Sequence, residues 1–369
     1  MSASNTRGPL GFGLMRLPRK GLGIDIAQTS EMVDLFLASG FTYFDTARIY
    51  YGSEEAARKA LVERHPRDSY TLTSKLHAGL ARSEKSAKRQ LETSLARSGA
   101  GYFDYYLLHA IMENNTDRYN RFGIWDFVRE QQAKGLIRHY GFSFHGGPEL
   151  LEQLLNEHPD VAFVQLQINY ADWENPTVQA RANYEVARRH GKQVVIMEPV
   201  KGGALASPPP EVRRLFDAAA PGVSYASWAL RFAASLDGVL AVLSGMSNLD
   251  QLRDNLSTMT NFRPLDSEEQ KIIQKAQQIL GHSSAIACTA CHYCTKGCPK
   301  NIPIPEIFAA ANKQLANGQQ AEAKAAYAAA TAPGSRASDC IGCKQCEEAC
   351  PQHLPVTRLL GQCAGMLEH

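Results

Sequence analysis

The sequence lacks the long apolar runs that would tie a chain to a membrane, and it has no cysteine before position 288. No stretch of about 18 apolar residues occurs, so we expect no transmembrane helix. The first residues, MSASNTRGPLGFGLMRLPRK, contain no apolar segment long enough for a signal peptide. We therefore expect a cytoplasmic protein.

A strong charge of one sign is also missing. The formal net charge is +2, from 39 Lys and Arg against 37 Asp and Glu. Such a balance provides no basic field for nucleic acid or an anionic membrane, so neither is expected as a partner. With 369 residues, and roughly 100–200 residues per domain, the chain suggests two domains or a large domain with a small one.

All nine cysteines fall between Cys288 and Cys363, and eight of them form two copies of the spacing C-x2-C-x2-C-x3-C-P, 52 residues apart. This spacing is typical of bacterial ferredoxins with two [4Fe–4S] clusters, in which the fourth cysteine of each run binds the other cluster. One predicted ligand set is Cys288, Cys291, Cys294 and Cys350. The other predicted set is Cys340, Cys343, Cys346 and Cys298.

Disulfides and zinc are the alternatives for this cysteine block. Disulfides need an oxidising compartment, and no secretion signal is seen. Zinc takes four ligands, usually as two separated pairs, whereas each run here has three closely spaced cysteines and a Cys-Pro. Cys363 lies outside both runs, and we interpret it as a small buried residue. The Ala-rich stretch 307–330 between the runs favours a helical insertion.

Strand-like apolar runs alternate with amphipathic helical patterns before the cysteine block, which indicates parallel βαβ units. The eight strand candidates are Leu10–Met15, Thr42–Asp45, Tyr70–Lys75, Asp104–His109, Arg138–Ser143, Val161–Gln167, Gln193–Met197 and Val239–Leu243. Eight units in about 250 residues predict a (β/α)8 TIM barrel. A doubly wound open sheet is the alternative, and the lack of G-x-G-x-x-G after the first strand weakens it.

Polar residues follow three consecutive strand candidates, at the ends where such barrels place catalytic groups. These residues are Asp45, Tyr50, Lys75 and His109. Each has a structural interpretation by itself: a helix cap, a surface lysine, a core histidine. Four such groups at one rim are hard to attribute to capping and packing, so together they predict an active site.

The chain resembles the aldo/keto reductase family. The motifs that carry the likeness are FDTARIYYGSEE, LTSKL, DYYLLHA, GFS, LQINY, EPVKGG and SGMSNLDQLRDN, in this order from Phe44 to Asn255. The resemblance covers roughly residues 9–262. Within the family, the chain is similar to the branch that carries a C-terminal dicluster ferredoxin domain. This resemblance implies a barrel over 1–263, a linker helix over 264–284 and an α-rich ferredoxin-like domain over 285–369.

The resemblance implies reversible hydride transfer between a nicotinamide nucleotide and a carbonyl or alcohol. Tyr50 would be the general acid and base, although a free tyrosine titrates near ~10. Lys75 would favour its phenolate, and Asp45 would orient Lys75. His109 would orient the carbonyl and share the proton relay. The family spacing selects Tyr50, so Tyr51 would point elsewhere.

The nucleotide contacts implied by position come from several strand ends. They are Ser143, Gln167, Gly202, Gly203, Gly245, Ser247, Gln251 and Asn255. Two departures matter. Met197 stands where many members stack an aromatic ring, and Gly245 and Ser247 stand where a Lys or Arg often reads the 2′-phosphate. The choice between NADP and NAD therefore stays open.

A second hypothesis is an electron-transfer protein, in which the clusters exchange electrons with a redox partner protein and the barrel is a docking or sensing module. The same two departures, at Met197 and at the missing cation, motivate it. Clusters carry single electrons and a nicotinamide carries a hydride, so coupling them normally needs a flavin-like converter. No flavin signature is evident in the sequence.

Overall fold

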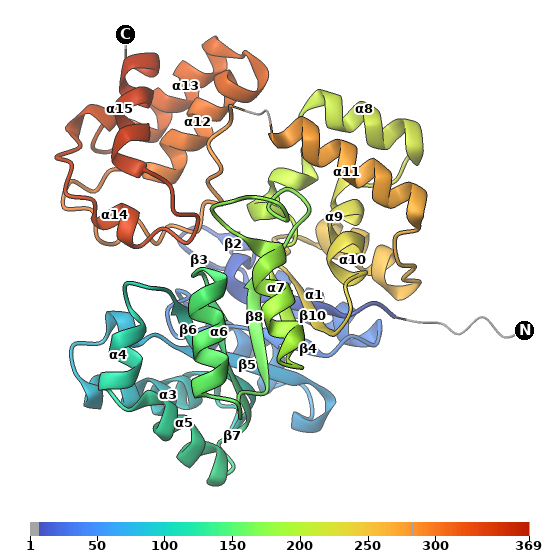
Figure 1. Cartoon of the computed structure of the whole chain (residues 1–369), viewed down its shortest axis with the longest axis vertical. Coiled ribbons are helices and arrows are strands. Elements are labelled where there is room, and N and C mark those ends of the chain that lie inside the picture. Colours follow the sequence, from blue (N-terminus) through green and yellow to red (C-terminus); the bar gives the residue numbers. More distant parts are fainter. Residues whose placement is uncertain (1–6, 282–283, 369) are drawn as a thin grey trace, which may run out of the picture. The chain divides into compact units, whose positions relative to one another are not determined.

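The computed structural model of the protein describes residues 7–281 and 284–368 (Figure 1). By their internal contacts these residues form two compact units. The barrel unit comprises the described residues of Met1–Glu174, Gln179–Pro199 and Ala226–Asp266. The cluster unit comprises Asn175–Val178, Val200–Tyr225 and the described residues of Ser267–His369.

Eight parallel strands close into a barrel in the first unit, which confirms the predicted (β/α)8 fold. Closure is direct, because β1 pairs with both β10 and β4. All eight strand candidates correspond to strands: β1 (Leu10–Gly13), β4 (Tyr43–Asp45), β5 (Thr71–Leu76), β6 (Phe103–Ile111), β7 (Ile137–Phe144), β8 (Phe163–Gln167), β9 (Gln193–Met197) and β10 (Val239–Ser244). An unpredicted antiparallel pair, β2 (Arg19–Lys20) and β3 (Gly23–Ile24), follows β1.

Helices connect the strands of the barrel. They are α1 (Ile26–Ala38), α2 (Ser53–Ala57), α3 (Glu84–Ser98), α4 (Thr116–Arg121), α5 (Ile124–Ala133), α6 (Pro148–Glu157), α7 (Ala180–Arg189), α9 (Tyr225–Ala234) and α10 (Leu249–Thr260). Local signals set their ends: Ser83 and Ser86 form a capping box at the start of α3, and left-handed Gly99 (φ 66°) ends it. Buried leucines at a helical spacing give α6 one apolar face.

The inside of the barrel is filled by side chains from alternating strands, as in other barrels of this class. Tyr43, Leu107, Phe163, Val195 and Ala241 form one apolar cluster there. The polar strand ends lie beyond it: Asp45 is the last residue of β4, and Gln167 is the last of β8. The carboxyl end of the barrel is therefore where chemistry can be placed.

The cluster unit is built from helices and loops. Its helices are α8 (Pro210–Ala219), α11 (Ser267–Gly281), α12 (Ile304–Asn317), α13 (Gln320–Thr331), α14 (Gln345–Glu348) and α15 (Val356–Leu367). The predicted helical insertion is two helices, because left-handed Gly318 (φ 70°) ends α12. A small core of residues such as Ile307, Phe308 and Leu360 also includes Cys294 and Cys346.

The domain boundaries expected from the sequence stay predictions. Most of the expected linker helix over 264–284 corresponds to α11. Residues 282–283 of that linker, residues 1–6 of the expected barrel domain and residue 369 of the expected ferredoxin-like domain lie outside the described residues.

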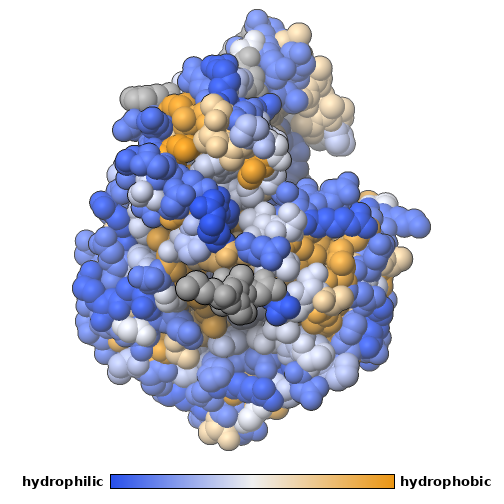
Figure 2. All heavy atoms as spheres, turned by 90° about the vertical axis from the view of Figure 1, so that its right-hand side faces the viewer, coloured by the Kyte–Doolittle hydropathy of each residue, from blue (hydrophilic) through white to orange (hydrophobic). Residues whose placement is uncertain are grey.

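Within the described part of the chain, no helix combines the length and the apolar character needed to cross a bilayer. On the face drawn in Figure 2, hydrophilic residues predominate and apolar residues lie in separate small groups.

Candidate active site and cluster sites

A buried ion pair lies at the carboxyl end of the barrel. Lys75 Nζ donates to Asp45 Oδ1 at 2.5 Å and to the Thr46 carbonyl oxygen at 2.8 Å. The Lys75 side chain has no exposed surface, and that of Asp45 is 5% exposed. A buried ammonium group is costly unless it is paired and hydrogen-bonded. The pair therefore fixes the position of the Lys75 amine.

Burial dominates the titration of this pair. It raises the pKa of Asp45 and lowers the pKa of Lys75, while their mutual attraction opposes both shifts. Lys75 therefore gives up its proton more readily than an exposed lysine does. Such a group can exchange a proton with a neighbouring phenol.

Tyr50 and His109 lie next to the pair. Lys75 Nζ is 5.1 Å from the centre of the Tyr50 ring. The rings of Tyr50 and His109 meet edge to face with centres 5.7 Å apart. Tyr50 is half-buried, whereas Tyr51 is 80% exposed. The structure thus brings the four predicted residues together, with Tyr50 rather than Tyr51 at the site.

His77, which the sequence reasoning missed, adds a second imidazole. Its ring centre is 5.5 Å from that of His109. The side chain of Gln90 holds the backbone of His77, accepting from its N–H at 3.0 Å and donating to its carbonyl oxygen at 3.1 Å. The sequence did contain a signal, because His77 directly follows the LTSKL motif at the end of β5.

Ser143 and Gln167 are both buried at strand ends. Ser143 Oγ accepts from the Ala110 N–H at 2.7 Å, and Ala110 has a left-handed backbone (φ 56°). Gln167 Nε2 donates to Asp172 Oδ2 at 2.9 Å. Protein partners thus hold both side chains in place before any ligand arrives.

Asn169 and Asp172 form a buried polar network that the sequence reasoning did not single out. Asn169 Nδ2 donates to Asp172 Oδ2 at 2.8 Å and to the Glu198 carbonyl oxygen at 3.1 Å. The Asp172 N–H donates back to Asn169 Oδ1 at 2.9 Å. Alternate residues point to the same side of an extended chain, so Gln167 and Asn169 in LQINY could have suggested it.

The segment after β10, which contains the predicted nucleotide contacts Gly245, Ser247, Gln251 and Asn255, is ordered by its own side chains. The Ser247 N–H donates to Gln251 Oε1 at 2.7 Å, and Asn255 Nδ2 donates to Ser244 Oγ at 2.8 Å. Asn248 caps α10 by accepting from the Gln251 N–H at 2.9 Å. A helix start of this kind suits a phosphate group.

The cation Arg16 lies beside this loop, whose residues 245–248 before α10 include no Lys or Arg. Gly245 leaves room for Arg16, because a Cβ atom on Gly245 would lie 3.2 Å from Arg16 Cδ. Ser247 Oγ donates to the Arg16 carbonyl oxygen at 2.8 Å. Arg16 Nη2 is 4.0 Å from Glu198 Oε1. Nothing local in the sequence indicates this contact, because Arg16 follows β1 and the loop follows β10.

Gly202 and Gly203 belong to the cluster unit. They lie in a 3-10 segment, Lys201–Ala206, with left-handed φ angles of 64° and 100°. The Gly203 N–H donates to the Val200 carbonyl oxygen at 3.0 Å.

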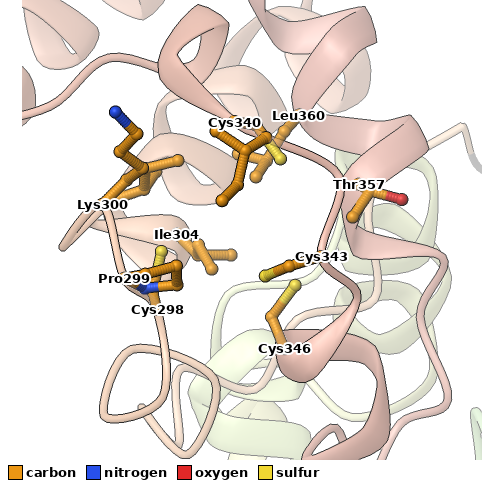
Figure 3. A pocket seen from close by; sticks show the side chains of 11 residues that line it. Cys298, Pro299, Lys300, Ile304, Cys340, Cys343, Cys346, Thr357 and Leu360 are labelled. Atoms are coloured by element: carbon orange, nitrogen blue, oxygen red, sulfur yellow. The ribbon is translucent and has the colours of Figure 1, made fainter.

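The cysteines of one predicted ligand set line a common pocket (Figure 3). Cys340, Cys343 and Cys346 come from the second run, and Cys298 comes from the first. Pro299, Ile304 and Leu360 contribute apolar walls, and four thiols in an apolar pocket are the donor set that a [4Fe–4S] cluster needs. The crossed arrangement stays a prediction, and this juxtaposition supports it.

The other predicted ligand set is marked by its electrostatics. Burial raises the pKa of Cys294, and the neighbouring thiols of Cys291, Cys288, Cys350 and, least, Cys346 add to the shift. Cys350, from the second run, therefore lies near the first run. The donors of this set also fit a cluster.

The two runs repeat an unusual backbone. Ala290 and His292, on either side of Cys291, have left-handed φ angles of 51° and 61°. Gly342 and Lys344 occupy the equivalent places in the second run, with φ angles of 71° and 63°. Non-glycine residues adopt this conformation at a cost and keep it where the surroundings demand it. The repeated backbone supports the prediction that both runs wrap the same kind of cluster.

None of the nine cysteines forms a disulfide. In the described ranges, no three His, Cys, Asp or Glu side chains converge as the ligands of a single metal ion would. Cys363 is 1% exposed in the core of the cluster unit.

Two family descriptions match the chain. Residues 9–278 match the aldo/keto reductase family, and residues 287–354 match the 4Fe-4S dicluster domain. Among curated proteins, the uncharacterized oxidoreductase YqkF of Bacillus subtilis is 24% identical over 72% of this chain and 91% of its own length. Aldo-keto reductase str7 of Strobilurus tenacellus is 27% identical over 53% of this chain and 59% of its own.

Solved structures show the same fold. An aldo-keto reductase from Klebsiella pneumoniae in complex with NADPH has a TM-score of 0.61 at 20% identity, over 75% of this chain and 96% of that one. Another from the same organism, in complex with NADP and acetate, has a TM-score of 0.59 at 21% identity, over 73% and 91% of the two chains.

Proposed function

The chain belongs to the aldo/keto reductase family and carries a 4Fe-4S dicluster domain, and from this premise we propose that it interconverts carbonyl and alcohol substrates with Tyr50 as general acid and base. The observation that carries the proposal is the buried pair of Lys75 and Asp45 beside Tyr50 and His109. A phenol next to a buried ammonium and an imidazole can supply the proton that carbonyl reduction requires.

Each residue has one role in this proposal. The Tyr50 hydroxyl gives its proton to the carbonyl oxygen during reduction and takes it back during alcohol oxidation. Lys75 replenishes or accepts that proton, and Asp45 holds the Lys75 amine at 2.5 Å. His109 orients the carbonyl oxygen. A bound nicotinamide nucleotide would supply or accept the hydride.

The predicted nucleotide contacts would divide between the carboxamide and the rest of the nucleotide. Ser143 and Gln167 would face the carboxamide. The remaining predicted contacts, for the phosphates and the adenosine, are Gly202, Gly203, Gly245, Ser247, Gln251 and Asn255. Arg16 joins them as the cation beside Gly245. The NADP-bound Klebsiella neighbours support a nicotinamide cofactor, and binding assays with NADPH and NADH decide the preference.

The eight cysteines of the two runs would hold two [4Fe–4S] clusters in the crossed sets described above. Bound clusters would exchange single electrons. Iron and sulfide analysis of anaerobically purified protein tests this part, and about eight iron atoms per chain are expected.

Turnover tests the enzyme itself. The anaerobically purified protein is mixed with NADPH or NADH and a panel of aldehydes and ketones, and loss of the reduced nucleotide is followed. Oxidation that depends on the carbonyl supports the proposal. No oxidation with any carbonyl, in protein that has its full iron content, would contradict it.

Electron transfer to a partner protein is the second candidate function, because the two cluster sites differ in exposure. Cys343 and its neighbour Ile341 (61% exposed) face solvent, whereas Cys294 and Cys350 are buried. A partner could therefore approach the second set closely. Rapid electron exchange between the reduced clusters and an added flavodoxin, with no carbonyl turnover, would favour this function over the first.

A further inference from the structure

The segment Lys201–Ala206 combines an unusual backbone with little burial. Lys201, Gly202 and Gly203 have successive left-handed φ angles of 49°, 64° and 100°. Of the six residues, only Leu205 is buried, at 2% exposure. Exposed segments with few buried contacts open at low free-energy cost. The conformation of this loop therefore depends on what packs against it.

The first cysteine run supplies such a support within the same unit. A Cβ atom on Gly202 would lie 2.6 Å from the Thr289 carbonyl oxygen and 2.8 Å from Thr289 Cα. The two backbones are thus in direct contact, and only glycine permits this approach. Thr289 itself is 2% exposed.

Thr289 lies in the chain between Cys288, a predicted cluster ligand, and Ala290, which is hydrogen-bonded to that ligand. It directly follows Cys288, and the Ala290 N–H donates to Cys288 Sγ at 3.4 Å. On the other side, the Ile286 N–H donates to Asn312 Oδ1 of α12 at 2.7 Å. The left-handed backbone after Thr289 fits a loop that wraps a cluster. Loss of the cluster would therefore release Thr289 on one side.

We infer that the first cluster run braces the Lys201–Ala206 loop through the contact of Thr289 with Gly202, so that the first cluster and the nucleotide stabilise each other's binding. The inference rests on the proposed function, in which Gly202 and Gly203 contact the nucleotide. Coupling of this kind is reciprocal: whatever the cluster does for nucleotide affinity, the nucleotide does for the cluster. It gives the iron a role in a hydride-transfer enzyme that needs no electron transfer.

Two glycines form a matched pair for the test. Alanine at either position must adopt a left-handed backbone, and φ 100° at Gly203 is the harder angle for it. Around Gly203, however, a Cβ atom would meet nothing within 4 Å. Gly203→Ala is therefore more strained locally but touches no cluster residue. Only Gly202→Ala pushes against Thr289.

The test uses the full-length, iron-loaded protein under anaerobic conditions. Gly202→Ala should change the EPR spectrum of one reduced cluster and lower nucleotide affinity by about tenfold, within the usual range of coupling between sites. Gly203→Ala should leave both cluster spectra unchanged. In the unaltered protein, saturating NADPH or NADH should shift the EPR spectrum or reduction potential of one cluster.

The outcomes separate this inference from the proposed function. If a nucleotide binds the unaltered protein but changes neither cluster, or if Gly202→Ala leaves both spectra unchanged, the coupling is wrong and the proposed function stands. If neither NADPH nor NADH binds the iron-loaded protein, the proposed function is wrong and the coupling falls with it. The nucleotide titration needs no variant, so it holds even where Gly202→Ala fails to fold.

Discussion

The barrel site and the cluster sites are positioned in different ways. In the barrel, Lys75 and Asp45 lie near the ends of adjacent strands, and their side chains are hydrogen-bonded directly to each other. In the cluster unit, Cys294 and Cys346 are themselves part of a small core. The difference teaches that folding alone brings the proposed catalytic groups of the barrel together, whereas some of the predicted cluster ligands are themselves core residues of the cluster unit.

Replacing Tyr50 tests the barrel site and has the largest expected effect. Tyr50→Phe removes the phenolic hydroxyl, which is the proposed proton donor, and keeps the aromatic ring. General acid catalysis contributes about 10²–10⁴-fold, so kcat should fall by about that factor. Tyr51→Phe is the matched control, since Tyr51 is 80% exposed and should leave kcat unchanged. Equal rates for both variants would place the proton donor elsewhere.

Breaking the buried pair tests whether the polypeptide holds the site. Asp45→Asn leaves the Lys75 ammonium buried without its carboxylate, and removing one partner of a buried pair lowers the free energy of unfolding by about 3–5 kcal/mol. Glu84→Gln removes an ion pair with Lys88 that is 2.6 Å long but lies at the surface. Its expected cost is about 0–1 kcal/mol. Chemical denaturation compares the two, and similar losses would show that burial of the pair is unimportant.

Serine substitutions test the cluster sites, in which cysteines from both runs are proposed to bind each cluster. Cys298→Ser and Cys346→Ser should remove the same EPR signal, and Cys294→Ser and Cys350→Ser the other one. Each variant should keep about half of the iron. Cys363→Ser, in the same core, should keep all of it. Loss of one signal by Cys294→Ser and Cys298→Ser together would mean that each run binds its own cluster.

The smallest expected effect is at Arg16. Arg16→Gln removes the cation beside Gly245 and Ser247, and the resulting loss of about 1 kcal/mol corresponds to about fivefold weaker nucleotide binding. Arg253→Gln is the control, because Arg253 lies on α10 and pairs with exposed Asp250 at 3.6 Å. Titration with NADPH and NADH measures both variants. Equal affinities for Arg16→Gln and the unaltered protein would exclude Arg16 from the nucleotide site.

Much of the fold could be predicted from the sequence because its signals are local. Apolar runs followed by helical periodicity marked all eight strands, and Gln193–Met197 agrees at both ends. The antiparallel pair of β2 and β3 was not predicted, because strands of two residues are too short to show a periodic pattern. The grouping of Asp45, Lys75 and His109 could be anticipated because parallel strands bring their carboxyl ends to one rim.

Other features could not be predicted because they are contacts between distant segments. Arg16 lies against Gly245, and Gly202 lies against Thr289. No sequence pattern around either glycine indicates these contacts. The missing cation after β10 was therefore interpreted as a departure from the family, although the structure places one nearby. Likewise, the assignment of Val200–Tyr225 to the cluster unit follows from packing.

Isotope transfer tests the central claim most directly, namely that the barrel performs hydride chemistry and the clusters do not. The iron-loaded protein is given nucleotide deuterated at the reactive nicotinamide carbon, together with a carbonyl substrate, and the alcohol is analysed by mass spectrometry. We expect the deuterium on the former carbonyl carbon, and almost no product from Tyr50→Phe. An alcohol formed without the label, with hydrogen from solvent, would show that electrons travel singly and would contradict the account.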